Sequence, residues 1–288
     1  MQRTYDVKRR MGQIYLSLVP LWAFTLGLGV GYISYEIYLP VWIINIGIMF
    51  IAAWLLGLHV MRSRDVEKKQ LALGAFFLIV PYLLISMFFG LGPPPETVKG
   101  WVATAIEQQI RYIMLIVAGL FIFFGFAILR EKLKIRGEGF YSTIGFTALM
   151  VAIPLFVINM IFWSAYLPEL FKFMTASGLE KSPEWFHPVR QEFNLLTNVE
   201  VAITYFAAAA FAASFRVAGW FSKTSSLVCM VINFVALFII VLPFSQQLLS
   251  IPFFIVTIPA VPFLMPYFMG INLLRRVGNH EMDIASGA

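Results

Sequence analysis

The sequence predicts an all-α integral membrane protein, a bundle of eight transmembrane helices that forms a single domain over residues 1–288. Composition is the first reason: 60% of the residues are hydrophobic and 12% are charged, against roughly 25% charged residues in a soluble domain. The second is the length of the apolar stretches, since a helix needs about 20 apolar residues to cross a bilayer. Such stretches must be helical because backbone polar groups in hydrocarbon need internal partners.

We expect the spans, in chain order, at residues 11–34, 39–62, 70–92, 106–129, 142–166, 197–219, 224–246 and 250–274. The first follows a charged N-terminus and is too long for a cleaved signal core, so we expect an uncleaved signal anchor. The third ends at Gly92 and three prolines, which begin a stiff extended link. The last contains four prolines, and each tends to kink or interrupt a helix: Pro252, Pro259, Pro262 and Pro266.

The connections between spans are alternately rich and poor in Lys and Arg, and this pattern predicts the orientation of the chain. Sixteen of the 21 basic residues fall at the two termini and in the second, fourth and sixth connections. This pattern places both termini and these connections in the cytoplasm. A seven-span alternative would put Arg275 and Arg276 outside, against the pattern. The basic inner rim suits anionic lipid headgroups and accounts for the net charge of +6 without nucleic acid.

The outer connection over residues 167–196 is the longest one. We expect a short interfacial helix over residues 167–174. Ser182 and Pro183 predict a second helix start, with Ser as the cap and Pro at the first helical position. This loop is the candidate lid or docking surface.

The sequence contains no recognisable catalytic or cofactor motif. It has three histidines and one cysteine, Cys229, which are too few and too scattered for a metal site. No phosphate loop, nucleophile elbow or dinucleotide fingerprint is present. We therefore expect no cofactor, no metal, no nucleic-acid partner and, on balance, no enzymatic activity.

Polar residues gather near the predicted outer ends of the helices. Glu107 precedes Arg111 by four residues, the favourable order for a helical ion pair, and Asn198 and Glu200 begin the sixth span. In one interpretation Arg111 reaches the interface and the glutamates are solvated. In another, an acidic, water-filled outer vestibule contains an Arg111–Glu107 pair, and Glu200 binds a cation or carries a proton. In a third interpretation, these residues contact a partner chain.

Four further polar residues are weaker candidates for the same site. Glu36 and Glu169 flank the second and fifth spans at a similar depth, while Asn159 lies deeper and can bridge helices by hydrogen bonds. His59 ends the second span on the inner side, where capping competes with a ligand or proton-carrying role.

Three functional classes remain open. Transport of a small solute or ion fits the proline-rich last span and the acidic outer residues. A non-catalytic accessory or scaffold subunit fits the absence of catalytic motifs, with other membrane subunits or a second copy as partners besides the lipid bilayer. A membrane-embedded lipid-modifying enzyme fits least. We expect an integral protein of the bacterial cytoplasmic membrane and favour transport.

Overall fold

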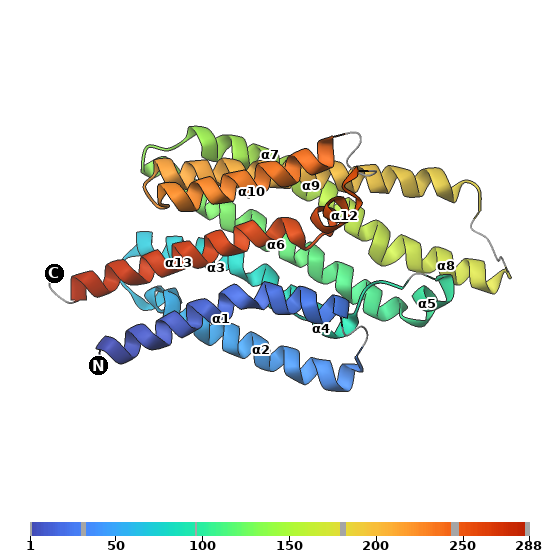
Figure 1. Ribbon diagram of the computed structural model, residues 1–288, viewed down its shortest axis with the longest axis horizontal. Helices are drawn as coiled ribbons and strands as arrows, with labels where there is room; N and C mark the ends of the chain where they lie inside the picture. Colours follow the sequence, from blue (N-terminus) through green and yellow to red (C-terminus); the bar gives the residue numbers. More distant parts are fainter. Residues whose placement is uncertain (1, 30–32, 96, 179–182, 243–247, 286–288) are drawn as a thin grey trace.

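The computed structural model describes residues 2–29, 33–95, 97–178, 183–242 and 248–285, and this part of the chain is helical without strands (Figure 1). The first half contains α1 (Gln2–Gly29), α2 (Tyr35–Leu56), η1 (Leu58–Arg62), α3 (Val66–Ile85), α4 (Phe88–Leu91), α5 (Val98–Ala103) and α6 (Ala105–Ile135). The second half contains α7 (Phe140–Ile161), the π-helical η2 (Phe162–Tyr166), α8 (Leu167–Ala176), α9 (Phe186–Val217), α10 (Lys223–Val241), α12 (Ser250–Thr257), η3 (Val261–Phe263) and α13 (Leu264–Ala285).

Several of these helices are long and apolar enough to cross a membrane, which agrees with an integral membrane protein. Among the described residues they number six, and a bent pair raises the number to seven if it forms one span. The six are α2, α3, α6, α7 with its continuation through α8, α9 and α10. The predicted first span is helical as α1 but is not among them, so the count of eight stays a prediction.

The predicted last span is interrupted, as its prolines indicate. The stretch from Ser250 to Thr257 and the stretch from Val261 to Asn279 meet at a bend of 69°. Pro259 lies in the break, and Pro262 lies in η3. A proline lacks the backbone N–H that would continue the helical hydrogen bonds, so the chain changes direction here.

The predicted long outer connection over residues 167–196 is largely helical instead. The chain leaves α7 through η2 and continues directly into α8, so residues 167–174 are helical but extend the preceding long helix instead of forming a separate interfacial one. The π-helical turn accommodates Pro168 at the start of α8, where a missing N–H costs least. Ser182 lies outside the described residues. The next helix, α9, begins at Phe186, well before the predicted start at 197.

The long helices run side by side between two ends of the bundle, and both chain termini lie at the same end (Figure 1). We call that end the inner end, after the predicted orientation, and the opposite end the outer end. Basic connections meet at the inner end: Arg136 pairs with Glu67 at 3.1 Å, and Arg276 donates to the Gly219 carbonyl. The side of the membrane that this end faces stays a prediction.

The inner end is closely packed. A Cβ atom built on Gly57 would lie 2.0 Å from the Leu274 carbonyl oxygen, and one on Gly278 would lie 2.3 Å from the Leu56 carbonyl oxygen. Both neighbours are backbone atoms that cannot move aside easily. Glycine at these two positions therefore lets α13 approach the end of α2.

Candidate binding cavity

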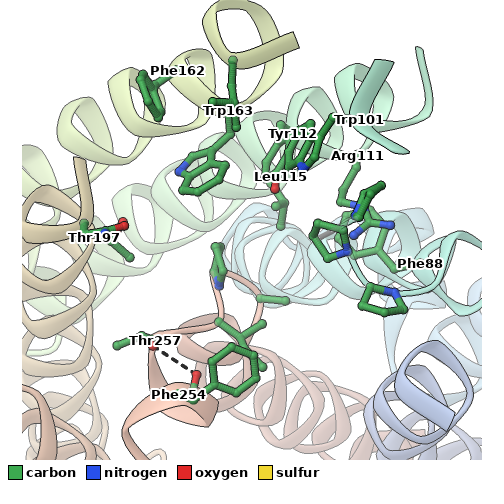
Figure 2. Close-up of a pocket in the computed structure, with 18 of the residues that line it drawn as sticks. Phe88, Trp101, Arg111, Tyr112, Leu115, Phe162, Trp163, Thr197, Phe254 and Thr257 are labelled. Carbon is green, nitrogen blue, oxygen red and sulfur yellow. Dashed lines mark hydrogen bonds between the residues drawn. The ribbon is translucent and has the colours of Figure 1, made fainter. Parts of the chain in front are cut away.

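A cavity of about 1000 Å³ lies among the outer ends of the helices. Its walls come from α1, the end of α3, the start of α4, the α4–α5 connection, α5, α6, η2 with α8, α9, α12 and the break after it. Volumes of about 300–1000 Å³ are typical of sites that enclose small organic ligands. Figure 2 shows Trp101, Tyr112 and Trp163 on one side of the cavity and Phe254 with Thr257 on another.

Stacked aromatic rings form one wall. The rings of Trp101 and Tyr112 are nearly parallel, with centroids 6.3 Å apart. Trp163 lies 6.2 Å from Trp101 and 6.0 Å from Tyr112, and Phe171 meets Trp101 edge-on at 5.9 Å. These rings come from α5, α6, η2 and α8, so contacts between helices distant in sequence fix the shape of the wall.

Arg111 lies beside this wall and is 6% exposed. Its Nη2 donates hydrogen bonds to the carbonyl oxygens of Leu91 at 3.0 Å and Gly92 at 2.6 Å. These carbonyls end α4, where the helix dipole favours a positive charge. The guanidinium carbon lies 5.6 Å from the centre of the Phe88 ring, whereas Nε is buried and has no hydrogen-bond partner among the described residues.

The break between α12 and η3 forms the opposite wall. Ile258, Pro259 and Ala260 line the cavity there. The break leaves carbonyl groups without helical partners, and tyrosine hydroxyls from other helices satisfy two of the carbonyls around it. Tyr82 donates to the Ala260 oxygen at 3.1 Å, and Tyr205 donates to the Val256 oxygen at 3.0 Å.

Glu200 is connected to the cavity through a short chain of hydrogen bonds. Its side chain is 1% exposed, and Oε1 accepts from Asn159 Nδ2 at 2.9 Å. Asn159 also donates to Thr197 Oγ1 at 2.8 Å and accepts from Trp163 Nε1 at 3.0 Å. Thr197 and Trp163 line the cavity. The other carboxyl oxygen, Oε2, is buried with no partner among the described residues.

Helix geometry gives the depth of these two charged groups. Arg111 is 19 residues from Arg130 on α6, and Glu200 is 16 residues from Arg216 on α9. At about 1.5 Å per residue, they lie about 28 Å and 24 Å from those inner basic residues. A hydrocarbon core is about 30 Å thick, so both groups lie nearly one such thickness from those residues, toward the outer end of the bundle.

The solvated-glutamate interpretation fails for Glu200, which is buried, and Arg111 is buried rather than extended into solvent. The predicted pair of Arg111 with Glu107 is also absent from the ion pairs of the described residues, because Arg111 turns to the end of α4 instead. Glu107 is half-buried in the first turn of α6. Asn198 is half-buried and lines the cavity.

The weaker candidates fall in different places. Asn159 is fully buried and joins Glu200 to the cavity wall. Glu36 is exposed at the start of α2, and Glu169 is exposed and pairs with Lys172 at 2.7 Å. His59 lies in η1 toward the inner end, where its Nδ1 is 2.9 Å from the Trp54 carbonyl oxygen. Asn159 is therefore the candidate that the described hydrogen bonds connect to the cavity.

Among the described residues, the charged side chains on the cavity wall are basic. Arg111 and Arg190 line it, and none of its described lining residues is Asp or Glu. The described lining therefore gives no support to the acidic vestibule, which stays a prediction. The predicted glutamates do not line the cavity for two reasons. Glu200 lies behind Asn159, Thr197 and Trp163, and Glu36 and Glu169 are exposed at the surface.

Sequence reasoning missed the aromatic wall. Trp101 and Trp163 fall near the predicted outer interface, where tryptophan is common in any membrane protein, and their stacking depends on η2 and α5. In the part of the chain that the structure describes, no cluster of three or more His, Cys, Asp or Glu side chains could hold a metal ion.

No family model, characterised protein or solved structure matches the chain.

Proposed function

We propose that this multi-pass membrane protein is a transporter that takes up a small organic solute through the outer cavity. The observation that carries the proposal is a cavity bordered by two helix interruptions, the α3–α4 break and the α12–η3 bend. Interrupted helices supply free backbone groups and points of bending, and transporters use them to form solute sites within the membrane.

The eight-pass topology with cytoplasmic termini belongs to this proposal. It is supported by the common position of the two termini (Figure 1) and by the basic connections that meet at the inner end. In that arrangement the cavity receives solute from outside the cell. The closely packed seam around Gly57 and Gly278 then closes the route on the cytoplasmic side.

Glu200 is the group that we assign to coupling. A buried carboxyl group in the membrane is costly and is usually retained for function. Asn159 links it to Trp163 and Thr197 on the cavity wall, so solute binding can alter its surroundings. A proton fits the free Oε2 better than a metal ion does, because hard cations need several oxygen ligands. The neighbouring Asn159 Nδ2 and Trp163 Nε1 are donors instead.

Uptake into proteoliposomes tests the proposal while the identity of the solute is open. Purified protein is reconstituted and incubated with a defined mixture of anionic, cationic, zwitterionic and neutral organic solutes, and the contents are measured by mass spectrometry under an imposed proton gradient. We expect at least one solute to accumulate with the unmodified protein and not with the Glu200→Gln variant. Glu169→Gln is the matched control, because Glu169 is exposed and pairs with Lys172, and it should retain uptake.

Two results would contradict the proposal. If no solute enters above protein-free liposomes, or if Glu200→Gln takes up solute as the unmodified protein does, transport coupled through Glu200 is wrong. Native mass spectrometry of the protein extracted from its own membranes addresses the accessory-subunit alternative. Stoichiometric partner chains would favour that alternative over a stand-alone transporter.

A further inference from the structure

The charge of Arg111 has no acidic counter-ion among the described residues. Its hydrogen bonds go to two neutral carbonyl groups, and its Nε is buried without a partner. Removing a charged group from water is expensive unless another group compensates it. The carbonyls of Leu91 and Gly92 compensate part of this cost, and an anion in the cavity would compensate the rest.

Further hydrogen-bond donors lie on the same wall. None of the described hydrogen bonds involves the Tyr112 hydroxyl or the Trp101 indole N–H, and both residues line the cavity beside Arg111. Indole N–H and guanidinium N–H groups can only donate, and a hydroxyl can donate. A ligand that satisfies these three groups therefore presents acceptor atoms.

Much of the remaining lining is aromatic or aliphatic, and its polar members are Arg190, Asn194, Thr197, Asn198 and Thr257. Trp163 and Phe254 present rings toward the cavity (Figure 2). Phe171 also lines the cavity, and Ala23 and Ile258 contribute small and branched aliphatic groups. Aromatic side chains prefer stacked or edge-on ring partners. A ligand body that packs against these rings is apolar and planar.

A cationic ligand is the competing interpretation, because aromatic walls also attract cations. Two features oppose it here. Arg111 and Arg190 both line the cavity and would repel a second positive charge, and none of the described lining residues is acidic. A cation held by aromatic rings needs negative charge or solvent nearby to compensate its charge. Arg111 instead places a positive charge beside these rings.

We propose that the cavity binds an amphipathic organic anion, with its carboxylate, sulfonate or phosphate group at Arg111 and its planar apolar body against Trp101, Tyr112 and Trp163. The proposal names the solute class of the proposed transporter and rests on that function only for the step across the membrane. A free solute and the headgroup of an anionic lipid share this chemistry.

Calorimetric titration of the full chain in phosphatidylcholine nanodiscs tests the proposal directly. The probe is naphthalene sulfonate, which stays charged and crosses lipid poorly, and the comparison ligand is naphthalene sulfonamide, its neutral isostere. We expect the sulfonate to bind at least about tenfold more tightly, because hydrogen bonds between charged groups are stronger than those to a neutral group. Arg111→Gln should abolish that preference, while Arg62→Gln, at the inner end over the Trp54 ring, should preserve it.

A second variant keeps the test decisive if Arg111→Gln does not fold. Tyr112→Phe keeps the stacked ring and removes only the hydroxyl, and it should weaken sulfonate binding severalfold.

Nanodiscs that contain phosphatidylglycerol distinguish the source of the anion. Weaker sulfonate binding in those discs means that the lipid headgroup competes at Arg111, whereas unchanged binding assigns the site to a free solute.

Equal binding of the sulfonate and the sulfonamide, preference for a naphthyl ammonium ion, or an unchanged preference in a folded Arg111→Gln variant would overturn the inference. These outcomes are separable from those of the uptake experiment. Sulfonate binding without uptake of any solute would contradict the proposed transport and support the anion site. Uptake of cations alone would support the proposed transport and contradict the anion site.

Discussion

Glu138 and Glu200 are both buried, at 3% and 1% exposed, yet their surroundings differ. Glu138, at the inner end before α7, accepts from the backbone N–H groups of Tyr141 and Ser142 and from the Ser214 hydroxyl. Glu200 accepts from Asn159 only and leaves Oε2 without a partner among the described residues. A buried acid with several donors fixes structure, whereas one with a free oxygen keeps the capacity to bind something else.

The same contrast applies to the two ends of the bundle. The inner end has backbone contacts so close that only glycine fits at Gly57 and Gly278. The outer end contains the cavity, two helix interruptions and the buried but incompletely bonded Arg111. Satisfied and close-packed groups contribute stability, and unsatisfied groups beside a cavity are retained at a cost to stability. We therefore assign stability to the inner end and ligand binding to the outer end.

The largest effect on stability is expected from Gly278→Ala. The added methyl group would meet the Leu56 backbone oxygen, and overpacking of this kind costs about 1–3 kcal/mol or more. Gly47→Ala on α2 is the matched control, because a Cβ there meets nothing within 4 Å. Unfolding in mixed detergent micelles should show a clear loss for the first variant and none for the second. Equal stability of the two variants would contradict a close-packed inner end.

A smaller loss is expected from Glu138→Gln. The amide can present one acceptor oxygen but turns its NH₂ group toward donors that now lack a partner, which costs about 1–3 kcal/mol. The same unfolding measurement checks this value. If the variant unfolds as the unmodified protein does, the three donors around Glu138 do not hold the α6–α7 connection to α9.

The smallest effect on stability is expected from Glu200→Gln. The amide oxygen can still accept from Asn159, and the NH₂ group takes the place of an oxygen that has no described partner. We expect unchanged or slightly increased stability together with lost solute uptake. A loss of stability as large as that of Glu138→Gln would remove the contrast between the two acids.

Sequence reasoning recovered the class of the protein and the general positions of its helices, because hydrophobic length and the placement of basic residues are local signals. It also predicted the proline-rich interruption and selected Arg111 and Glu200 as candidates, both of which are buried and whose roles stay predictions. One of its three interpretations paired Arg111 with Glu107, four residues earlier, whereas the described partners of Arg111 are the carbonyls of Leu91 and Gly92 in the preceding segment. Contacts of that kind are set by tertiary packing and leave no pattern in the sequence.

The aromatic wall escaped prediction for the same reason. Trp101 and Trp163 lie more than 60 residues apart, and they meet because α5 packs against α8 and η2 packs against α6. The expected acidic vestibule followed from counting charges near the outer ends. Helix rotation decided the outcome, since it placed Asn198 on the cavity wall and Glu200 behind it.

Cysteine labelling on a single helix tests the contrast between the two ends most directly. The one native cysteine, Cys229, is first replaced by alanine, and Thr197→Cys or Ala208→Cys is added on α9. Thr197 lines the cavity, while Ala208, about 16 Å further along the helix, is 1% exposed. We predict that a membrane-impermeant thiol reagent added outside intact cells modifies the Thr197→Cys variant and leaves the Ala208→Cys variant unreacted. An unreactive Thr197→Cys variant, or equal reaction of both, would contradict an outer cavity above a closed inner half.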